Sequence, residues 1–141
     1  TRILKLEDFL LGNRKTARRP NELVSEILIP NHNDNSCGNF EKLGARAYLV
    51  ISIVMVGAVV ELDNQQTVLK LKIAVGSCSP VAKRLGLLEK EAVGQKITSI
   101  KIEQKHIDSL KPIDDIRATA DYRYNIIPEL LIRAIKGVVM L

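Results

Sequence analysis

The segment from Phe40 to Tyr48 carries the side chains best suited to hold an anionic or aromatic ligand. It contains Lys42 and Arg46, and Tyr48 ends it just before a long apolar run that predicts a strand. A lysine or an arginine at the rim of a sheet can reach a phosphate, and either cation can stack against an aromatic ring system. The residue types alone agree equally well with a ligand contact and with a salt bridge at the rim.

The other reactive side chains do not combine into a catalytic or metal-binding set. His32 lies in a polar loop and His106 in a lysine-rich stretch, so we expect both to be solvated surface histidines. Asp114 and Asp115 are adjacent, and carboxylates in such a position favour the N-terminus of a following helix. We therefore predict that the chain holds no catalytic residue and no metal ion.

The two cysteines, Cys37 and Cys78, are far apart in the sequence. A common iron–sulfur cluster or a structural zinc ion needs four ligands, so neither site can be built from this chain alone. Free thiols in a reducing cytoplasm are the favoured interpretation. Cys78 has no resolving cysteine or histidine nearby in sequence, so we expect it to have a structural role.

The composition indicates one basic domain with few aromatic residues. The 141 residues are 46% hydrophobic, with a formal net charge of +5 at pH 7 that is consistent with an anionic partner. With no tryptophan and 4% aromatic residues, the chain lacks the stacking platform of single-stranded nucleic-acid readers. Its longest apolar run, 49–60, is shorter than the roughly 20 residues of a membrane span, and no signal peptide opens the sequence. We expect a cytoplasmic protein that binds no nucleic acid and does not insert into membranes.

Three segments have the residue pattern of strands. Residues 22–29 are mostly apolar and are followed by a proline. Residues 50–62 are almost entirely apolar and rich in β-branched side chains, which is typical of a central strand covered on both faces. Residues 67–75 alternate between apolar and polar side chains, and a polar turn joins them to the central strand. The last two segments should form an antiparallel hairpin.

Helices are predicted after the strands. A serine–proline pair should start a helix over 79–93, and a shorter helical piece is expected over 102–110. Pro128 either opens the last helix or lies inside a longer one that begins near Ala120. Strands followed by helices favour an α+β arrangement. The last helix is the clearest because its apolar residues recur on one face: Ile127, Leu130, Leu131, Ala134, Ile135 and Val138.

Four segments also follow the order and spacing of a known family. Residues 8–30 resemble FFxGxRxTxLxPxELVxxIxIP, residues 40–52 resemble FxKxGxRxxxxIS, residues 75–84 resemble VGSxSPxxxR, and residues 114–134 resemble DDxRxSAxYR followed by LxxRAL. These patterns are similar to the C-terminal domain of the FAD-binding subunit of molybdenum hydroxylases, the xanthine dehydrogenase and aerobic carbon monoxide dehydrogenase group. The resemblance covers nearly the whole chain.

The resemblance implies a fold and a place in a larger protein. The fold is α+β, with a small antiparallel sheet of three to four strands packed against about three helices. Residues 1–141 would form a single domain at the C-terminal end of a flavoprotein subunit, whose FAD-binding N-terminal domains are absent from this sequence. The piece is then expected to be an inactive part of an oxidoreductase.

The family's chemistry is electron transfer. The resemblance implies a large subunit with a molybdenum cofactor, where substrate is hydroxylated, and a small subunit whose 2Fe-2S clusters pass electrons to FAD. FAD then reduces NAD, a quinone or oxygen. The domain would help to cover the flavin and to dock the partner subunits.

The FxK pattern supplies the expected cofactor-binding residues. The resemblance places Lys42 near FAD and makes residues 43–48, with Arg46 and Tyr48, the loop beside the flavin ring. This chain has a single arginine where many relatives have a pair, and Leu49-Val50 where xanthine-oxidising relatives have acidic residues. These departures leave the electron acceptor open.

A stand-alone basic α+β module for an anionic partner is the alternative hypothesis. The two hypotheses differ in what precedes Thr1 in the native protein. A flavoprotein subunit predicts glycine-rich FAD loops upstream, whereas a module predicts a native start close by.

Overall fold

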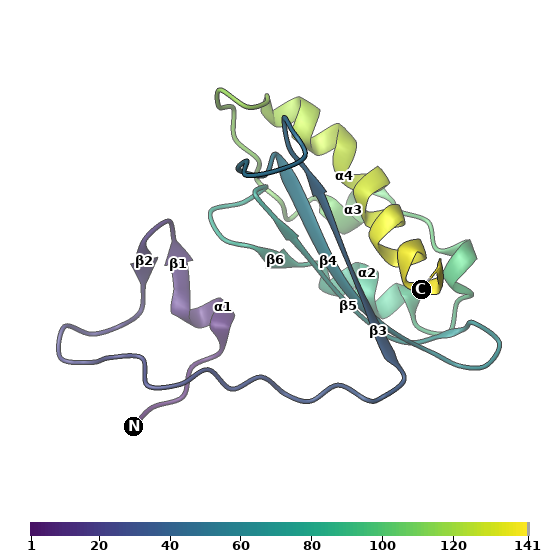
Figure 1. The fold of residues 1–141 in the computed structure, drawn as a ribbon, viewed down its shortest axis with the longest axis horizontal. Helices are drawn as coiled ribbons and strands as arrows, with labels where there is room; N and C mark the ends of the chain where they lie inside the picture. Colours follow the sequence, from purple (N-terminus) through teal and green to yellow (C-terminus); the bar gives the residue numbers. More distant parts are fainter. Residues whose placement is uncertain (141) are drawn as a thin grey trace.

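The computed structural model describes residues 1–140 and has an α+β architecture (Figure 1). Its main sheet has four antiparallel strands in the order β3-β4-β5-β6. These strands are Ser36–Leu43 (β3), Val54–Leu62 (β4), Val68–Gly76 (β5) and Lys83–Arg84 (β6). The expected fold class, a small antiparallel sheet with helices packed against it, is confirmed.

Strands β4 and β5 form the predicted antiparallel hairpin, with Met55 opposite Gly76 at its open end. Its turn is held by Asp63, whose Oδ1 accepts hydrogen bonds from the backbone N–H groups of Gln65 at 2.9 Å and Thr67 at 2.7 Å. Asparagine and aspartate favour turns because their short side chains bond nearby backbone groups in this way. The hairpin is therefore built from local sequence signals.

The helices α2 (Gly86–Ala92), α3 (Gln104–Ile107) and α4 (Ala120–Lys136) lie on one side of the main sheet (Figure 1). Helix α4 runs along β3 and β4, while α2 packs against β5. Short 3-10 helices, Ile97–Ser99 (η1) and Gly137–Met140 (η2), precede α3 and follow α4. The predicted apolar stripe of α4 and of the turn after it is buried: Ile127, Leu130, Leu131, Ala134, Ile135 and Val138.

Helix boundaries differ from the prediction in two places. The helix expected over 79–93 begins only at Gly86, because Lys83 and Arg84 instead pair with the edge of β5 as strand β6. The piece expected over 102–110 is reduced to the single turn of α3. Pro128 lies inside α4, so the longer of the two predicted helices is the correct one.

Strand β4 is covered on one face only, which corrects the prediction of a doubly covered strand. Its inward residues Val54, Val56, Ala58 and Val60 are at most 3% exposed. Between them, Met55, Gly57 and Val59 are half-buried and point to the other face. Across the described part of the chain, α2, α3 and α4 all lie on the first face (Figure 1). The run of β-branched residues therefore predicts the burial of the inward side chains of β4 correctly and that of the outward side chains wrongly.

The first 35 residues form an arm on the side of the sheet away from α4 (Figure 1). The arm contains a helical turn, Leu6–Phe9 (α1), and a two-stranded antiparallel ribbon of Leu10–Gly12 (β1) and Lys15–Thr16 (β2). The strand predicted over 22–29 is not formed. Within residues 1–140 no backbone group pairs with residues 23–30, and a strand requires a hydrogen-bonded neighbour.

The two faces of the hairpin predict opposite responses to a new negative charge. Val56→Asp would place an unpaired carboxylate among buried apolar side chains, and we expect it to lower the free energy of unfolding by about 3–5 kcal/mol. Lys72→Glu, on the outward face of β5, should change it by less than about 0.5 kcal/mol. Chemical denaturation of both variants checks this, and equal losses would contradict the assigned faces.

Candidate functional site

Three loops meet at one end of the main sheet. Because β3, β4 and β5 are antiparallel, the loop 44–53 before β4 and the turn 77–82 after β5 leave the sheet at the same end of the strands. The segment 112–119, which leads into α4, reaches this end as well, since Arg123 contacts Asp115 together with Ile53 and Ser77. We call the loop 44–53 the rim loop.

The rim loop is closed by the two cations that the sequence singles out. Lys42 Nζ donates a hydrogen bond to the Val50 carbonyl at 2.7 Å, and Arg46 Nη2 donates one to the Leu49 carbonyl at 2.8 Å. The loop is tight at its base, because a Cβ added to Gly44 would lie 2.5 Å from Val50 Cγ1. At the tip, Leu49 adopts a positive φ of 49°. The two hydrogen bonds therefore hold a bent backbone in place.

Apolar and aromatic side chains form the surface of the rim loop. Tyr48 is 82% exposed, Leu49 93% and Ile51 62%. Lys42 and Arg46 are exposed beside them. Arg46 and Tyr48 thus lie in the rim loop, and Lys42 lies at the end of β3 and contacts it, so the three predicted cofactor-binding residues are close together where uncovered apolar surface adjoins positive charge.

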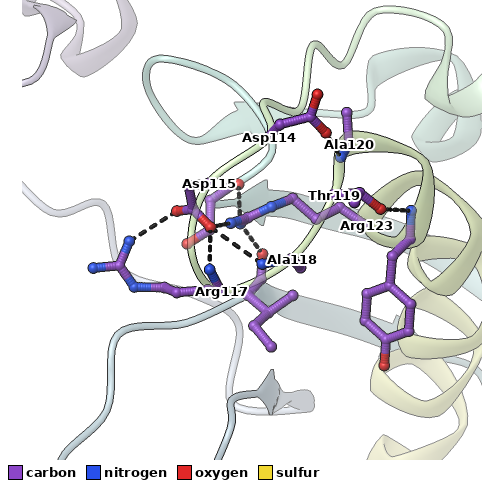
Figure 2. A network of polar contacts seen from close by, with 10 residues as sticks. Asp114, Asp115, Arg117, Ala118, Thr119, Ala120 and Arg123 are labelled. Atoms are coloured by element: carbon purple, nitrogen blue, oxygen red, sulfur yellow. Dashed lines mark hydrogen bonds and ion pairs between the residues drawn. The ribbon is translucent and has the colours of Figure 1, made fainter.

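A buried arginine ties the base of the rim loop to the rest of the fold (Figure 2). Arg123, at the end of the first turn of α4, is only 2% exposed. Its Nη1 donates to the carbonyl of Ile53 at 2.6 Å and to that of Ser77 at 3.2 Å. Its Nη2 donates to Asp115 Oδ1 at 2.6 Å. One guanidinium therefore joins the rim loop, the turn after β5 and the segment before α4.

Asp115 is the counter-charge in this cluster. Besides Arg123, it accepts hydrogen bonds from the backbone N–H and the guanidinium of Arg117, both at 2.8 Å, and from the N–H of Ala118 at 3.2 Å. Figure 2 shows the carboxylate between the two arginines. The Arg117 backbone N–H, and then the two guanidinium groups, hold the pKa of the Asp115 carboxyl well below its usual range. The Asp115 carboxyl is therefore ionised in the folded protein near neutral pH.

The two predicted acidic neighbours have different roles at the start of α4. Asp114 accepts a hydrogen bond from the backbone N–H of Ala120, as expected for a carboxylate near a helix N-terminus. The N-cap itself is Thr119, whose hydroxyl accepts from the N–H of Tyr122 at 3.1 Å. Asp115 instead accepts a hydrogen bond from the buried Arg123 guanidinium. The helix-terminus interpretation is thus confirmed for Asp114 and incomplete for Asp115.

The buried role of Arg123 was missed in the sequence, although a signal for it is present. Arg123 precedes Ile127 by four residues and Leu130 by seven, so it lies on the apolar stripe of α4. An arginine on the buried side of an amphipathic helix needs acceptors that desolvate with it. An acidic residue shortly before the helix was the available clue.

His106 is buried rather than solvated, which corrects the sequence prediction. It is 4% exposed, its Nδ1 accepts the backbone N–H of Glu103 at 2.9 Å, and its Nε2 lies 2.9 Å from Glu91 Oε2. A neutral ring in this position carries its proton on Nε2 and donates it to Glu91. His106 thus links α2 to α3. It lines a cavity of about 250 Å³ that shares no residue with the rim loop.

The two cysteines are free, as predicted. Cys78 is fully buried, and its burial raises the pKa of the thiol to about 11. The thiol is therefore protonated near neutral pH and unreactive, in line with the structural role predicted for it. Lys111 donates its backbone N–H to the Cys78 carbonyl at 2.9 Å, which connects the turn after β5 to the segment before α4.

Two further findings concern residues 1–140 as a whole. No helix in this range has the length and apolar character that crossing a membrane would require. No group of three or more histidine, cysteine, aspartate and glutamate side chains in the same range is arranged to hold a metal ion.

Comparison with known proteins gives one family and one fold. The sequence matches the model of the CO dehydrogenase flavoprotein C-terminal domain over residues 40–138. The structure resembles reconstituted CO dehydrogenase from Oligotropha carboxidovorans, with a TM-score of 0.82 and 21% identity, over 97% of this chain and 48% of that one. A search of curated proteins found no match.

Two other solved structures share this fold. A carbon monoxide dehydrogenase from Hydrogenophaga pseudoflava, which lacks the Mo-pyranopterin moiety of its molybdenum cofactor, gives a TM-score of 0.79 and 22% identity over 95% of this chain and 47% of that one. Quinoline 2-oxidoreductase from Pseudomonas putida 86 gives a TM-score of 0.75 and 20% identity over 94% of this chain and 46% of that one. The chain therefore spans about half the length of the solved chains it matches.

Removing the buried guanidinium should loosen the fold, whereas removing an exposed one on the same helix should not. Arg123→Met leaves the Ile53 and Ser77 carbonyls without their donor, and we expect a loss of about 3 kcal/mol in the free energy of unfolding. Arg133→Met, which removes an exposed i,i+4 ion pair with Glu129, should cost less than about 0.5 kcal/mol. Urea denaturation compares the two, and a similar small loss in both would refute the structural role of Arg123.

The low pKa of Asp115 predicts how that role depends on pH. A carboxyl whose pKa is lowered in the folded state stabilises it above the unfolded pKa of about 3.9, and this contribution is lost as pH falls toward the folded value. Asp115→Asn should therefore lower the melting temperature by several degrees between pH 8 and about pH 5. The difference from the unchanged protein should shrink below about pH 4. A difference that stays constant down to about pH 2 would show that the charge is not responsible.

Proposed function

Because the chain belongs to the CO dehydrogenase flavoprotein C-terminal domain family, we propose that it is the C-terminal part of an FAD-binding subunit in a molybdenum hydroxylase. It spans about half the length of the solved chains it resembles, which supports a longer parent subunit. In this proposal, residues 1–141 follow domains that carry most of the FAD site. The parent is an oxidoreductase, and this piece alone has no activity.

The observation that carries the proposal is the composition of the rim loop and of Lys42, the β3 residue that contacts it. An FAD molecule has a flat aromatic ring system and an anionic diphosphate, so a surface that meets it needs apolar area beside positive charge. Tyr48, Leu49 and Ile51 supply exposed apolar and aromatic area, and Lys42 and Arg46 supply the charge. The residues of the rim therefore fit the cofactor that the family implies.

Within that fit, the chain's own residues have separate tasks. Lys42 and Arg46 are cations that could turn from the Val50 and Leu49 carbonyls toward an anionic group. Tyr48 offers an exposed ring against which a flavin could pack. Arg123 lies behind the loop and keeps Ile53 in position. FAD, when bound, supplies the redox chemistry, and these residues bind and cover it.

The remaining parts of the proposal concern partners. Family membership supports a large subunit with the molybdenum cofactor and a small subunit with 2Fe-2S clusters, from which electrons reach the flavin. The outward face of β3 and β4 is suited to contact other protein, because Phe40 is 58% exposed and Met55 and Val59 are only half-buried. The parent complex is proposed to work in the cytoplasm, without nucleic acid and without membrane insertion.

Lys42 provides the sharpest test in the complete subunit. Lys42→Ala should weaken FAD retention about 10- to 100-fold, because a charge-assisted hydrogen bond contributes about 1.5–3 kcal/mol. Substrate oxidation at molybdenum should be unchanged when an artificial acceptor takes electrons before the flavin. The measurement is flavin absorbance per subunit after gel filtration, followed by the rate with the physiological acceptor.

Arg46→Ala serves as the graded comparison, with a smaller effect of the same kind. The melting temperature of each variant should match that of the unchanged subunit prepared without FAD, which separates loss of cofactor contacts from loss of fold. Unchanged FAD content and an unchanged rate in Lys42→Ala would reduce Lys42 to a residue that only closes the rim loop, and the cofactor assignment would be withdrawn.

A further inference from the structure

A segment of the arm exposes apolar side chains on both of its faces. Residues 23–29 include Leu23, Val24, Ile27, Leu28 and Ile29, which are 80%, 54%, 75%, 63% and 79% exposed. Three of these residues have odd numbers and two have even numbers, so an extended chain points them to opposite sides. Soluble proteins rarely leave such a contiguous apolar patch uncovered. This segment is built to be buried on both faces.

The backbone of the same segment also lacks partners. Among residues 1–140, no hydrogen bond reaches the N–H or C=O groups of residues 23–30. The chain nevertheless runs extended from the arm toward β3 (Figure 1). Its leucine, isoleucine and valine residues have high strand preference, and the proline at position 30 ends the run. The residue pattern therefore favours a strand, but within residues 1–140 no neighbouring strand pairs with this segment.

The start of the segment is already fixed in position. The Glu22 carboxylate accepts two hydrogen bonds from Arg2, at 2.8 and 2.7 Å, and one from the Arg19 backbone N–H at 2.8 Å. Arg18 donates to the Glu22 carbonyl. The Arg2 guanidinium and then the Arg19 N–H lower the pKa of Glu22 to about 2, so these contacts persist near neutral pH. The segment therefore leaves a preformed turn in a defined direction.

The comparisons supply the argument for what could cover this segment. The family model begins only at residue 40, so the arm lies outside the region it describes. The resemblance to CO dehydrogenase nevertheless extends over 97% of this chain, which must include the arm, within a chain about twice as long. We propose that residues 23–29 form a β-strand that pairs with a sheet edge of the upstream half of the same subunit and is covered by it on both faces. This inference rests on the proposed function only in requiring that a longer flavoprotein subunit exists.

Amide hydrogen exchange tests the pairing without any substitution. In the 141-residue chain, residues 23–29 should exchange at rates typical of unpaired backbone. In the complete subunit, the same amides should exchange at least about 100-fold more slowly, since paired strands are protected from exchange. Fast exchange in both proteins would overturn the proposal. Protection that appears in the 141-residue chain as a dimer forms would also overturn it, by assigning the surface to a second copy.

A matched pair of substitutions tests the covering of the side chains. Leu28 and Leu69 are both exposed in this structure, at 63% and 52%, and only Leu28 lies in the proposed strand. In the 141-residue chain, Leu28→Asp and Leu69→Asp should each leave the melting temperature nearly unchanged. In the complete subunit, Leu28→Asp should lower it by several degrees more than Leu69→Asp. Equal effects in the complete subunit would contradict the covering.

The FAD content of the same preparations keeps the two proposals apart. A complete subunit that protects residues 23–29 but contains no flavin would refute the proposed function and leave the strand assignment intact. A flavin-loaded subunit in which residues 23–29 exchange quickly would do the reverse.

Discussion

The contact between the buried Arg123 guanidinium and its three acceptors is the constraint on which the candidate site depends. A charge that is 2% exposed is tolerated only when it is paired with an opposite charge and hydrogen-bonded. Asp115 provides the opposite charge to Nη2, and the Ile53 and Ser77 carbonyls accept from Nη1 at 2.6 and 3.2 Å, while Nε is buried without a partner among the described residues. Lysine could not replace it, because only a planar guanidinium presents donors in several fixed directions. The position of the rim loop is therefore coupled to the packing of α4.

Local patterns account for most of the fold. The alternation in residues 67–75 and the polar turn at Asp63 predict the hairpin, and the apolar stripe around Leu130 predicts α4; both are confirmed. The boundary of α2 was wrong because the edge of β5 offers backbone hydrogen bonds to Lys83 and Arg84. Sequence patterns report the preference of each segment, and competition between segments decides the boundaries.

The exposed residues of the candidate site could be predicted from the sequence, but the contacts that support them could not. The resemblance points to Lys42, Arg46 and Tyr48, and the structure places them in or beside the rim loop, while their contact with FAD stays a prediction. The supports of that loop were harder to find, because Arg123 contacts Ile53 across 70 positions of sequence. His106 was misplaced for the same reason, since its partner Glu91 comes from a different helix. Contacts between distant segments have no periodic signature along the chain.

The hydrogen bond between Arg123 and Ile53 also has a consequence for the order in which the domain folds during synthesis. During synthesis the hairpin of β4 and β5 leaves the ribosome well before α4, and its contacts are local enough to form at once. The carbonyls of Ile53 and Ser77 then lack their donor until Arg123 emerges and α4 docks. The base of the rim loop consequently reaches its final contacts only after the last helix has been translated, and under the proposed function FAD would meet a completed rim only from that point on.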